Sequence, residues 1–386
     1  MKVTHISCWC RMKVYSIQAF HLKRSVEDLM GEKASVVTSN CGCFYEGNLT
    51  SVFSSFFNYN NLLIEGGIKN FVKFPHFRAK ARNASAISAR GMYRRVVEPI
   101  RGILYSVYSK QSDIVHYHQG PDAFGFAQLS HFLKWKNRAK KVVTIHTFSA
   151  LQKERPELNS IYNEVEAVIT HTEHDKTRLE KWGVKSEKLH VIPYGATIKP
   201  LKLAPRDGVI MFAGSPLINV KGFEHLAPAL RKLKEEGLVV PLKLHGYHMP
   251  GHKEWADGIS AREGISEQVR WLSLSSEDDL IDAYQRSKIC LIPYTDYPGS
   301  FPVTIAMANA TPVIVSDLVG VAEYIREAGG VVTSTSVPEL ARVIRNLLVD
   351  EGSLKQHGEA GRIVAEKRFS WDEVSRKTID VYRSII

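Results

Sequence analysis

The feature that most constrains this chain is an alternation of short β-branched runs with longer helix-like stretches, which occurs in two series. The first series contains apolar runs at residues 2–7, 34–40, 113–118, 141–148, 167–172 and 188–195. The second contains runs at 209–215, 241–246, 269–272, 288–294 and 311–317, followed by three helical stretches up to residue 386. Short buried strands that alternate with helices indicate parallel sheets covered on both faces. We therefore predict an α/β fold, which binds ligands at the carboxyl ends of its strands.

The length of the chain favours two domains, because 386 residues exceed what one hydrophobic core usually supports. The segment 196–208 contains two prolines and has neither helical nor strand periodicity, which is typical of a linker. We expect an N-terminal domain of residues 1–197 and a C-terminal domain of residues 198–369.

Neither a membrane span nor a leader is expected. No apolar run approaches the roughly 20 residues that a bilayer requires, and the N-terminal MKVTHIS alternates apolar with polar residues, unlike a signal peptide. A cytoplasmic location is the prediction. Cys8, Cys10, Cys41 and Cys43 form two C-x-C pairs that could bind a soft metal, but structural zinc usually takes a wider spacing. Free thiols in a reducing compartment are the favoured interpretation.

The net charge of +11 is unevenly distributed. Residues 69–110 carry ten lysines and arginines against one acidic residue, Glu98, and several aromatic side chains lie among them. This composition favours an anionic partner, and we expect peripheral attachment to an anionic membrane surface. The alternative is a solvated basic face whose aromatic residues pack on the core. No RNA-recognition or helix-turn-helix pattern accompanies the charge, so no nucleic-acid partner is expected.

Two loops of the second series have the character of anion sites. One strand is expected to end at Gly214, after which Lys221 and Gly222 open a helix. Free N–H groups and the positive end of the dipole lie at a helix N-terminus, and a lysine beside them suits a diphosphate. Farther along, Ser300 is a plausible N-cap and Pro302 a favoured first-turn residue, so a second helix should begin there.

The strand at 113–118 ends in two histidines separated by one residue. His116 and His118 should therefore point to the same face of their sheet, with His118 nearer the carboxyl end where ligands bind. We weigh a functional role for His118 against the alternative of a buried structural histidine.

These segments, in their order and spacing, resemble the retaining glycosyltransferases of family 4 (glycosyl transferases group 1) over nearly the whole chain. The matching segments are VHYH, KVVTIHTF, FAGSPLINVKG, PLKLHG, AMANATPVIVSD, GVAEYI and FSWDEV. The resemblance implies a GT-B fold of two facing Rossmann-like domains with an interdomain cleft, and a final helix, residues 370–386, that packs back onto the N-terminal domain. It also implies transfer of a sugar from a nucleotide-diphosphate sugar to a glycan or lipid-linked acceptor, with retention, and with no cofactor or divalent metal.

The same resemblance assigns site residues. His118 matches a histidine that contacts the transferring sugar, Lys221 matches the lysine that neutralises the donor diphosphate, and Asp296 stands beside the position of a family glutamate. These three are the expected catalytic residues. The expected donor-binding residues are Gly214, Ser215, Tyr297, Gly299, Ser300, Phe301, Pro302, Val303 and Glu323.

The chain also departs from the family pattern. Ser215 stands where the family has an arginine, and Tyr297 and Ile305 stand where it has two glutamates. Each of the charge-matched hydrogen bonds that such side chains could make would be worth about 1.5–3 kcal/mol. The alternative function is therefore a catalytically inactive GT-B protein that acts as a binding or partner subunit. A third possibility keeps the fold and changes the reaction, for example to epimerisation of the nucleotide sugar.

Overall fold

The computed structural model divides the chain into two compact units, one formed by Met1–Ile192 with Ser375–Ile386 and the other by Pro193–Val374. We refer to them as unit 1 and unit 2. The structure describes residues 3–9, 22, 24–26, 28–30, 35–40, 112–119, 133, 138–146, 148, 150–202, 204–214, 220–246, 252–274, 276–295, 301–318, 320, 322–328 and 330–386. The basic segment 69–110 and Cys10, Cys41 and Cys43 lie outside these residues.

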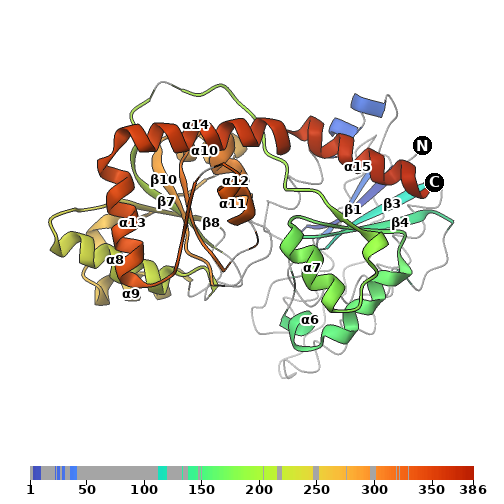
Figure 1. The fold of residues 1–386 in the computed structure, drawn as a ribbon, viewed down its shortest axis with the longest axis horizontal. Coiled ribbons are helices and arrows are strands. Elements are labelled where there is room, and N and C mark those ends of the chain that lie inside the picture. Colours follow the sequence, from blue (N-terminus) through green and yellow to red (C-terminus); the bar gives the residue numbers. More distant parts are fainter. Residues whose placement is uncertain are drawn as a thin grey trace, which may run out of the picture. The chain divides into compact units, whose positions relative to one another are not determined.

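Unit 1 is built on a six-stranded parallel sheet with the order β2-β1-β3-β4-β5-β6; strands β1, β3 and β4 are labelled in Figure 1. Its strands are β1 (Val3–Trp9), β2 (Ser35–Asn40), β3 (Ile114–Gln119), β4 (Lys140–Ile145), β5 (Ala167–Thr170) and β6 (Leu189–Val191). The described helices that follow β4 and β5 are α6 (Ala150–Glu154), a 3₁₀ segment (Pro156–Glu164), α7 (Glu173–Lys181) and a 3₁₀ turn (Ser186–Lys188).

One face of this sheet is apolar. Alternate residues of β3, β4 and β5, such as Tyr117, Val143 and Val168, are fully buried against side chains of the following helical segments, including Tyr162 and Leu179. Because side chains alternate across a strand, the opposite face is formed by the intervening residues, several of which are polar.

Unit 2 is a second six-stranded parallel sheet, with the order β12-β11-β10-β7-β8-β9. Its strands are β7 (Asp207–Gly214), β8 (Leu242–Gly246), β9 (Val269–Trp271), β10 (Ser287–Ile292), β11 (Val313–Ser316) and β12 (Val331–Thr333). Its helices are α8 (Phe223–Glu235), α9 (His252–Arg262), α10 (Glu277–Gln285), α11 (Phe301–Ala308), α12 (Ala322–Glu327), α13 (Val337–Val349) and α14 (Glu351–Arg368).

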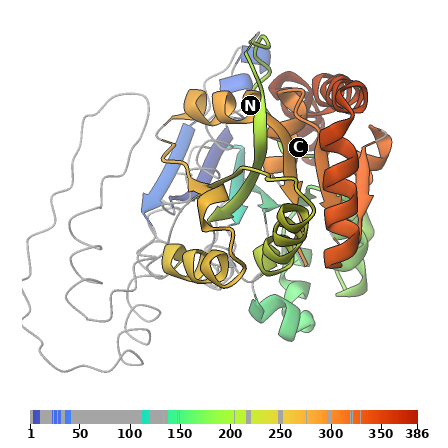
Figure 2. The same cartoon turned by 90° about the vertical axis from the view of Figure 1, so that its left-hand side faces the viewer.

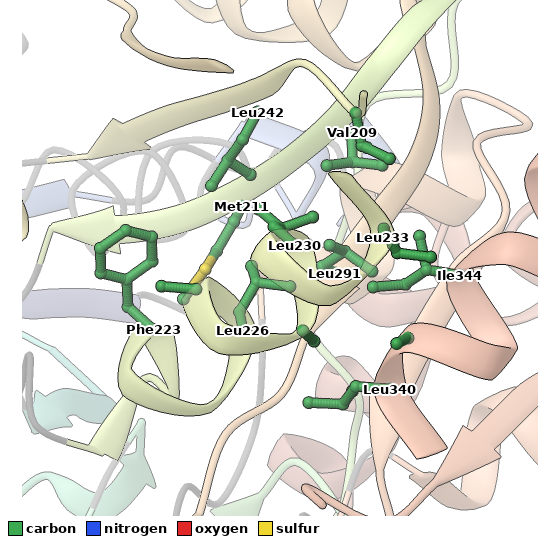
Figure 3. Packing of buried hydrophobic residues seen from close by; sticks show 14 of the residues in the cluster. Val209, Met211, Phe223, Leu226, Leu230, Leu233, Leu242, Leu291, Leu340 and Ile344 are labelled. Carbon is green, nitrogen blue, oxygen red and sulfur yellow. The ribbon is translucent and has the colours of Figure 1, made fainter. Parts of the chain in front are cut away.

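Helices cover both faces of the second sheet. Helices α8 and α13 contact each other and lie side by side in both views (Figures 1 and 2). Apolar residues three and four apart on α8, including Leu226 and Leu230, pack with Leu340 and Ile344 of α13 against β7, β8 and β10 (Figure 3). On the other face, α10 and α11 contact β10, and the hydroxyl of Tyr284 lies 2.9 Å from His245 Nε2. The prediction of two parallel α/β sheets is confirmed.

The chain passes from unit 1 to unit 2 after Ile192 and returns after Val374, inside helix α15 (Trp371–Ile385). An isolated bridge pairs Ala196 with Ser370 at the start of this helix. A bilayer-crossing helix is absent from the described residues, whose helices are too short or too polar for one.

Candidate active site

In unit 2 the chain order of the strands reverses between neighbours β7 and β10. Open α/β sheets bind ligands outside the carboxyl ends of the strands at such a point, because the loops that follow the two strands leave in opposite directions. The two segments that meet here are residues 220–222, which precede α8, and residues 293–295, which follow β10. They are about 70 residues apart in sequence, and the strand order makes them neighbours.

Three contacts join these segments. The Thr295 N–H donates to the carbonyl of Val220 at 3.0 Å. Lys221 Nζ lies 4.0 Å from the centroid of the Tyr294 ring, a cation–π geometry. The third contact is between Gly222 and Pro293, and it determines how closely the two segments approach each other.

Gly222 is the N-cap of α8 and has φ of 75° and ψ of 19°, a left-handed conformation that favours glycine. A Cβ added there would lie 1.8 Å from the carbonyl oxygen of Pro293. Only a residue without a side chain therefore permits this helix start. The prediction that β7 ends at Gly214 and that Lys221-Gly222 open a helix is confirmed.

The amino group of Lys221 is held away from water, since the residue is only 1% exposed. Burial lowers the pKa of Lys221 well below its ordinary value, because the charged form is poorly solvated there. A buried amine at the binding edge of a sheet is suited to bind an anion, which would restore the preference for the protonated form.

Helix α11 begins at Phe301, with Pro302 in its first turn, as the sequence predicted. All eight of its residues are buried. Carbonyl groups at its C-terminal end are bound by arginines: Arg206 donates to Ala310 at 2.7 Å and to Asn309 at 3.1 Å, and Arg362 donates to Ala308. These guanidinium groups complement the negative end of the helix dipole.

The structure describes only some of the other predicted site residues of unit 2. Gly214 ends β7, Phe301, Pro302 and Val303 form the first turn of α11, and Glu323 lies half-buried in α12. Ile305 is buried in α11. Five predicted residues lie outside the described residues: Ser215, Asp296, Tyr297, Gly299 and Ser300.

In unit 1, polar side chains gather at the carboxyl ends of β3, β4 and β5. The register pairs His118 with Thr144 and Thr144 with Ile169. Residues two positions farther along β4 and β5, His146 and His171, therefore share the face of His116 and His118. Both His146 and His171 directly follow the last residue of their strand.

The four histidines form a continuous stack. Ring centroids are 4.3 Å apart for His116 and His118, 5.4 Å for His118 and His146, and 5.0 Å for His146 and His171. All four side chains are buried. The expected common orientation of His116 and His118 is confirmed, whereas His146 and His171 were not predicted as site residues. The signal that could have found them is a histidine at the end of each neighbouring strand.

His116 has hydroxyl partners on both ring nitrogens. Its Nδ1 lies 2.6 Å from Tyr382 Oη of α15, and its Nε2 lies 2.6 Å from Thr144 Oγ1. These contacts fix the ring against the sheet, so His116 supports the stack, while His118 lies nearer the binding edge.

Replacing Tyr382 with phenylalanine should destabilise unit 1 by about 1–3 kcal/mol, because it removes a buried hydrogen bond to His116. Amide hydrogen exchange should then become faster in β3 and β4. Tyr284→Phe is the matched control, since it removes a similar hydrogen bond to His245 in unit 2. Unchanged exchange in β3 and β4 of Tyr382→Phe would contradict this role.

The described residues contain no cluster of three or more histidine, cysteine or acidic side chains arranged to hold a metal ion. Whether the reaction needs a divalent metal or a cofactor is not tested by this observation. The expected independence from both stays a prediction.

Two family models match the chain. The model described as Glycosyl transferases group 1 matches residues 196–364, and the model described as Glycosyltransferase Family 4 matches residues 58–199. Together they span most of the sequence and meet close to the boundary between units 1 and 2.

Individual relatives share about 30% sequence identity with this chain over roughly half of its length. An MMP α-(1→4)-mannosyltransferase of Mycolicibacterium hassiacum is 31% identical over 54% of this chain and 51% of its own length. A D-inositol 3-phosphate glycosyltransferase of Streptomyces bingchenggensis is 28% identical over 58% and 53%, respectively. The matches thus span about half the length of these curated relatives.

Among solved structures, HepE of Anabaena in complex with UDP-glucose aligns with 100% of this chain and 100% of its own, with a TM-score of 0.71 and 14% identity. A likeness at this identity shows the fold alone. The GT-B fold class that the sequence predicted is confirmed.

Proposed function

Because the chain belongs to the family of group 1 glycosyl transferases, we propose that it transfers a hexosyl group from a nucleotide-diphosphate sugar to a glycan or lipid-linked acceptor, with retention of anomeric configuration. The observation that carries this proposal is the buried amine of Lys221 at the point where the strand order of unit 2 reverses. In this proposal Lys221 binds the donor diphosphate, and the first turn of α11 contributes N–H groups to it.

Within this proposal, Asp296 acts at the transferring sugar, and the donor is also bound by Gly214, Ser215, Tyr297, Gly299, Ser300 and Glu323. His118 of unit 1 faces the transferring sugar. Stabilisation of the leaving diphosphate by a cation and by oriented N–H groups supplies the electrostatic part of catalysis. The attachment to an anionic membrane surface and the cytoplasmic location remain predictions.

A second candidate is an inactive GT-B protein that acts as a binding or partner subunit. Ile305 favours it, because the sequence resemblance places a glutamate at this position, and the buried apolar side chain of Ile305 has no polar atom that could bind a sugar nucleotide. The two candidates differ in whether a donor is consumed.

The deciding experiment is a donor screen by thermal shift and by product analysis. UDP-glucose and a nucleoside-diphosphate mannose are tested first, because a solved neighbour holds UDP-glucose and a relative is a mannosyltransferase. One donor should raise the unfolding midpoint and be transferred or hydrolysed. A ligand at about 100 times its Kd stabilises by about 2.7 kcal/mol. Binding without turnover would favour the inactive candidate, and neither binding nor turnover across the panel would overturn the proposed activity.

A further inference from the structure

Three of the four stacked histidines form a hydrogen-bonded chain that ends on a backbone carbonyl. His171 Nδ1 lies 2.9 Å from the carbonyl oxygen of Ile192. A carbonyl only accepts, so this nitrogen carries a proton. Burial lowers the pKa of His171 to about 4. The ring is neutral near pH 7, and its Nε2 is consequently unprotonated and acts as an acceptor.

The donor and acceptor roles at His171 determine the donor and acceptor roles of the next two histidines. His146 Nδ1 lies 3.0 Å from His171 Nε2, and it must donate, because two lone pairs cannot face each other at that distance. Burial and the neighbouring His171 and His118 hold the pKa of His146 well below its ordinary value. His146 is therefore neutral as well, and its Nε2 accepts from His118 Nδ1, which lies 3.2 Å away.

We propose that His171 and His146 are positioning residues that fix His118 as the Nδ1–H tautomer, so that His118 Nε2 is a hydrogen-bond acceptor for a hydroxyl group of the bound sugar. This proposal rests on the proposed function in one respect: the group that donates to His118 Nε2 is taken to be a sugar hydroxyl. The three residues come from successive strands, so the sheet register sets their spacing.

His116 contributes to the orientation of His118 in a different way. Its ring stacks on that of His118 at an angle of 26° and limits rotation of the plane. Its own partners are the hydroxyls of Tyr382 and Thr144, which can either donate or accept. They impose no tautomer, whereas the carbonyl of Ile192 does.

Long-range ¹H–¹⁵N NMR of the intact 386-residue chain at neutral pH tests the proposal without a donor. We expect His118, His146 and His171 each to show a protonated Nδ1 and an unprotonated Nε2. Finding His118 or His146 as the Nε2–H tautomer would overturn it. Failure of donor turnover with the expected tautomers would reject the proposed activity and leave the positioning chain intact.

Two substitutions of His171 separate positioning from packing. His171→Phe fills the site but offers His146 no acceptor, so the fixed tautomer of His118 should disappear and kcat/KM should fall about 10- to 100-fold, mainly through kcat. His171→Gln restores an amide donor for Ile192 and an acceptor for His146, so it should recover the wild-type tautomer and most of the activity. Tyr382→Phe is the control, because it removes a hydrogen bond of His116 and leaves the hydrogen bonds among His118, His146 and His171 in place. A folded His171→Phe variant that keeps the His118 tautomer would refute the inference.

Discussion

Replacement of Gly222 by alanine should destabilise unit 2 by about 2–5 kcal/mol. A left-handed backbone costs a residue with a side chain about 1–2 kcal/mol. Forcing an atom into a filled space costs about 1–3 kcal/mol more, and the new Cβ would meet the carbonyl oxygen of Pro293 at 1.8 Å. Faster amide exchange in β7 and β10 reports the destabilisation, since Gly222 joins the segments that follow these two strands.

Gly237 provides the matched control at the opposite end of the same helix. It has φ of 83°, close to that of Gly222, but an added Cβ there would have nothing within 4 Å. Gly237→Ala should therefore show only the backbone cost of about 1–2 kcal/mol. The difference between the two variants measures the close approach to Pro293. Equal destabilisation in both would show that this approach can relax and does not define the site.

Replacement of Lys221 by methionine should weaken binding of a nucleotide-diphosphate sugar about 10- to 150-fold and at the same time raise the stability of the free protein. Removal of a charge-assisted hydrogen bond costs about 1.5–3 kcal/mol, which gives the change in Kd. Stability should rise because methionine removes an amine whose charged form is penalised by burial. Titration of the donor followed by calorimetry measures the first effect, and thermal unfolding measures the second.

The pH dependence of Lys221→Met has a defined sign. Burial lowers the pKa of Lys221 in the folded state below its ordinary value of 10.5. Between the lowered pKa of the folded state and 10.5, the unfolded wild type binds more protons than the folded wild type. Its unfolding free energy therefore rises with pH in this range. The stability advantage of the variant should consequently shrink as the pH approaches 10.5. Lys232→Met is the control, because Lys232 lies on α8, the helix that Lys221 precedes, with its side chain 45% exposed and paired with Glu236. A Lys221→Met variant with unaltered donor affinity would remove Lys221 from the site.

Local sequence signals predicted the ends of elements in unit 2. Lys221-Gly222 and Ser300–Pro302 predicted where α8 and α11 begin, because caps and first-turn residues act within a few positions. Periodicity did not reveal α7, whose nine residues include one aliphatic side chain, Leu179. The available signal was its N-cap, where Thr172 accepts from the N–H of Asp175 at 3.1 Å.

The assembly of the candidate site was harder to predict, because it depends on strand order and register. Nothing in the sequence near Lys221 indicates that Tyr294 will lie beneath its amino group. That contact exists because β7 and β10 are neighbours in the sheet. Similarly, His146 and His171 become partners of His118 only through the register of three strands, which periodicity does not specify.

The return of the chain from unit 2 to unit 1 inside α15 has a consequence for biosynthesis. Residues 375–386 leave the ribosome after all of residues 193–374, so unit 2 can be completed while unit 1 still lacks its last segment. Until then, His116 lacks the hydroxyl of Tyr382, which follows it by 266 residues. The His116 ring consequently lacks this hydroxyl partner throughout synthesis of unit 2. Unit 1, whose strands are translated first, therefore receives its final segment only after unit 2 has been translated.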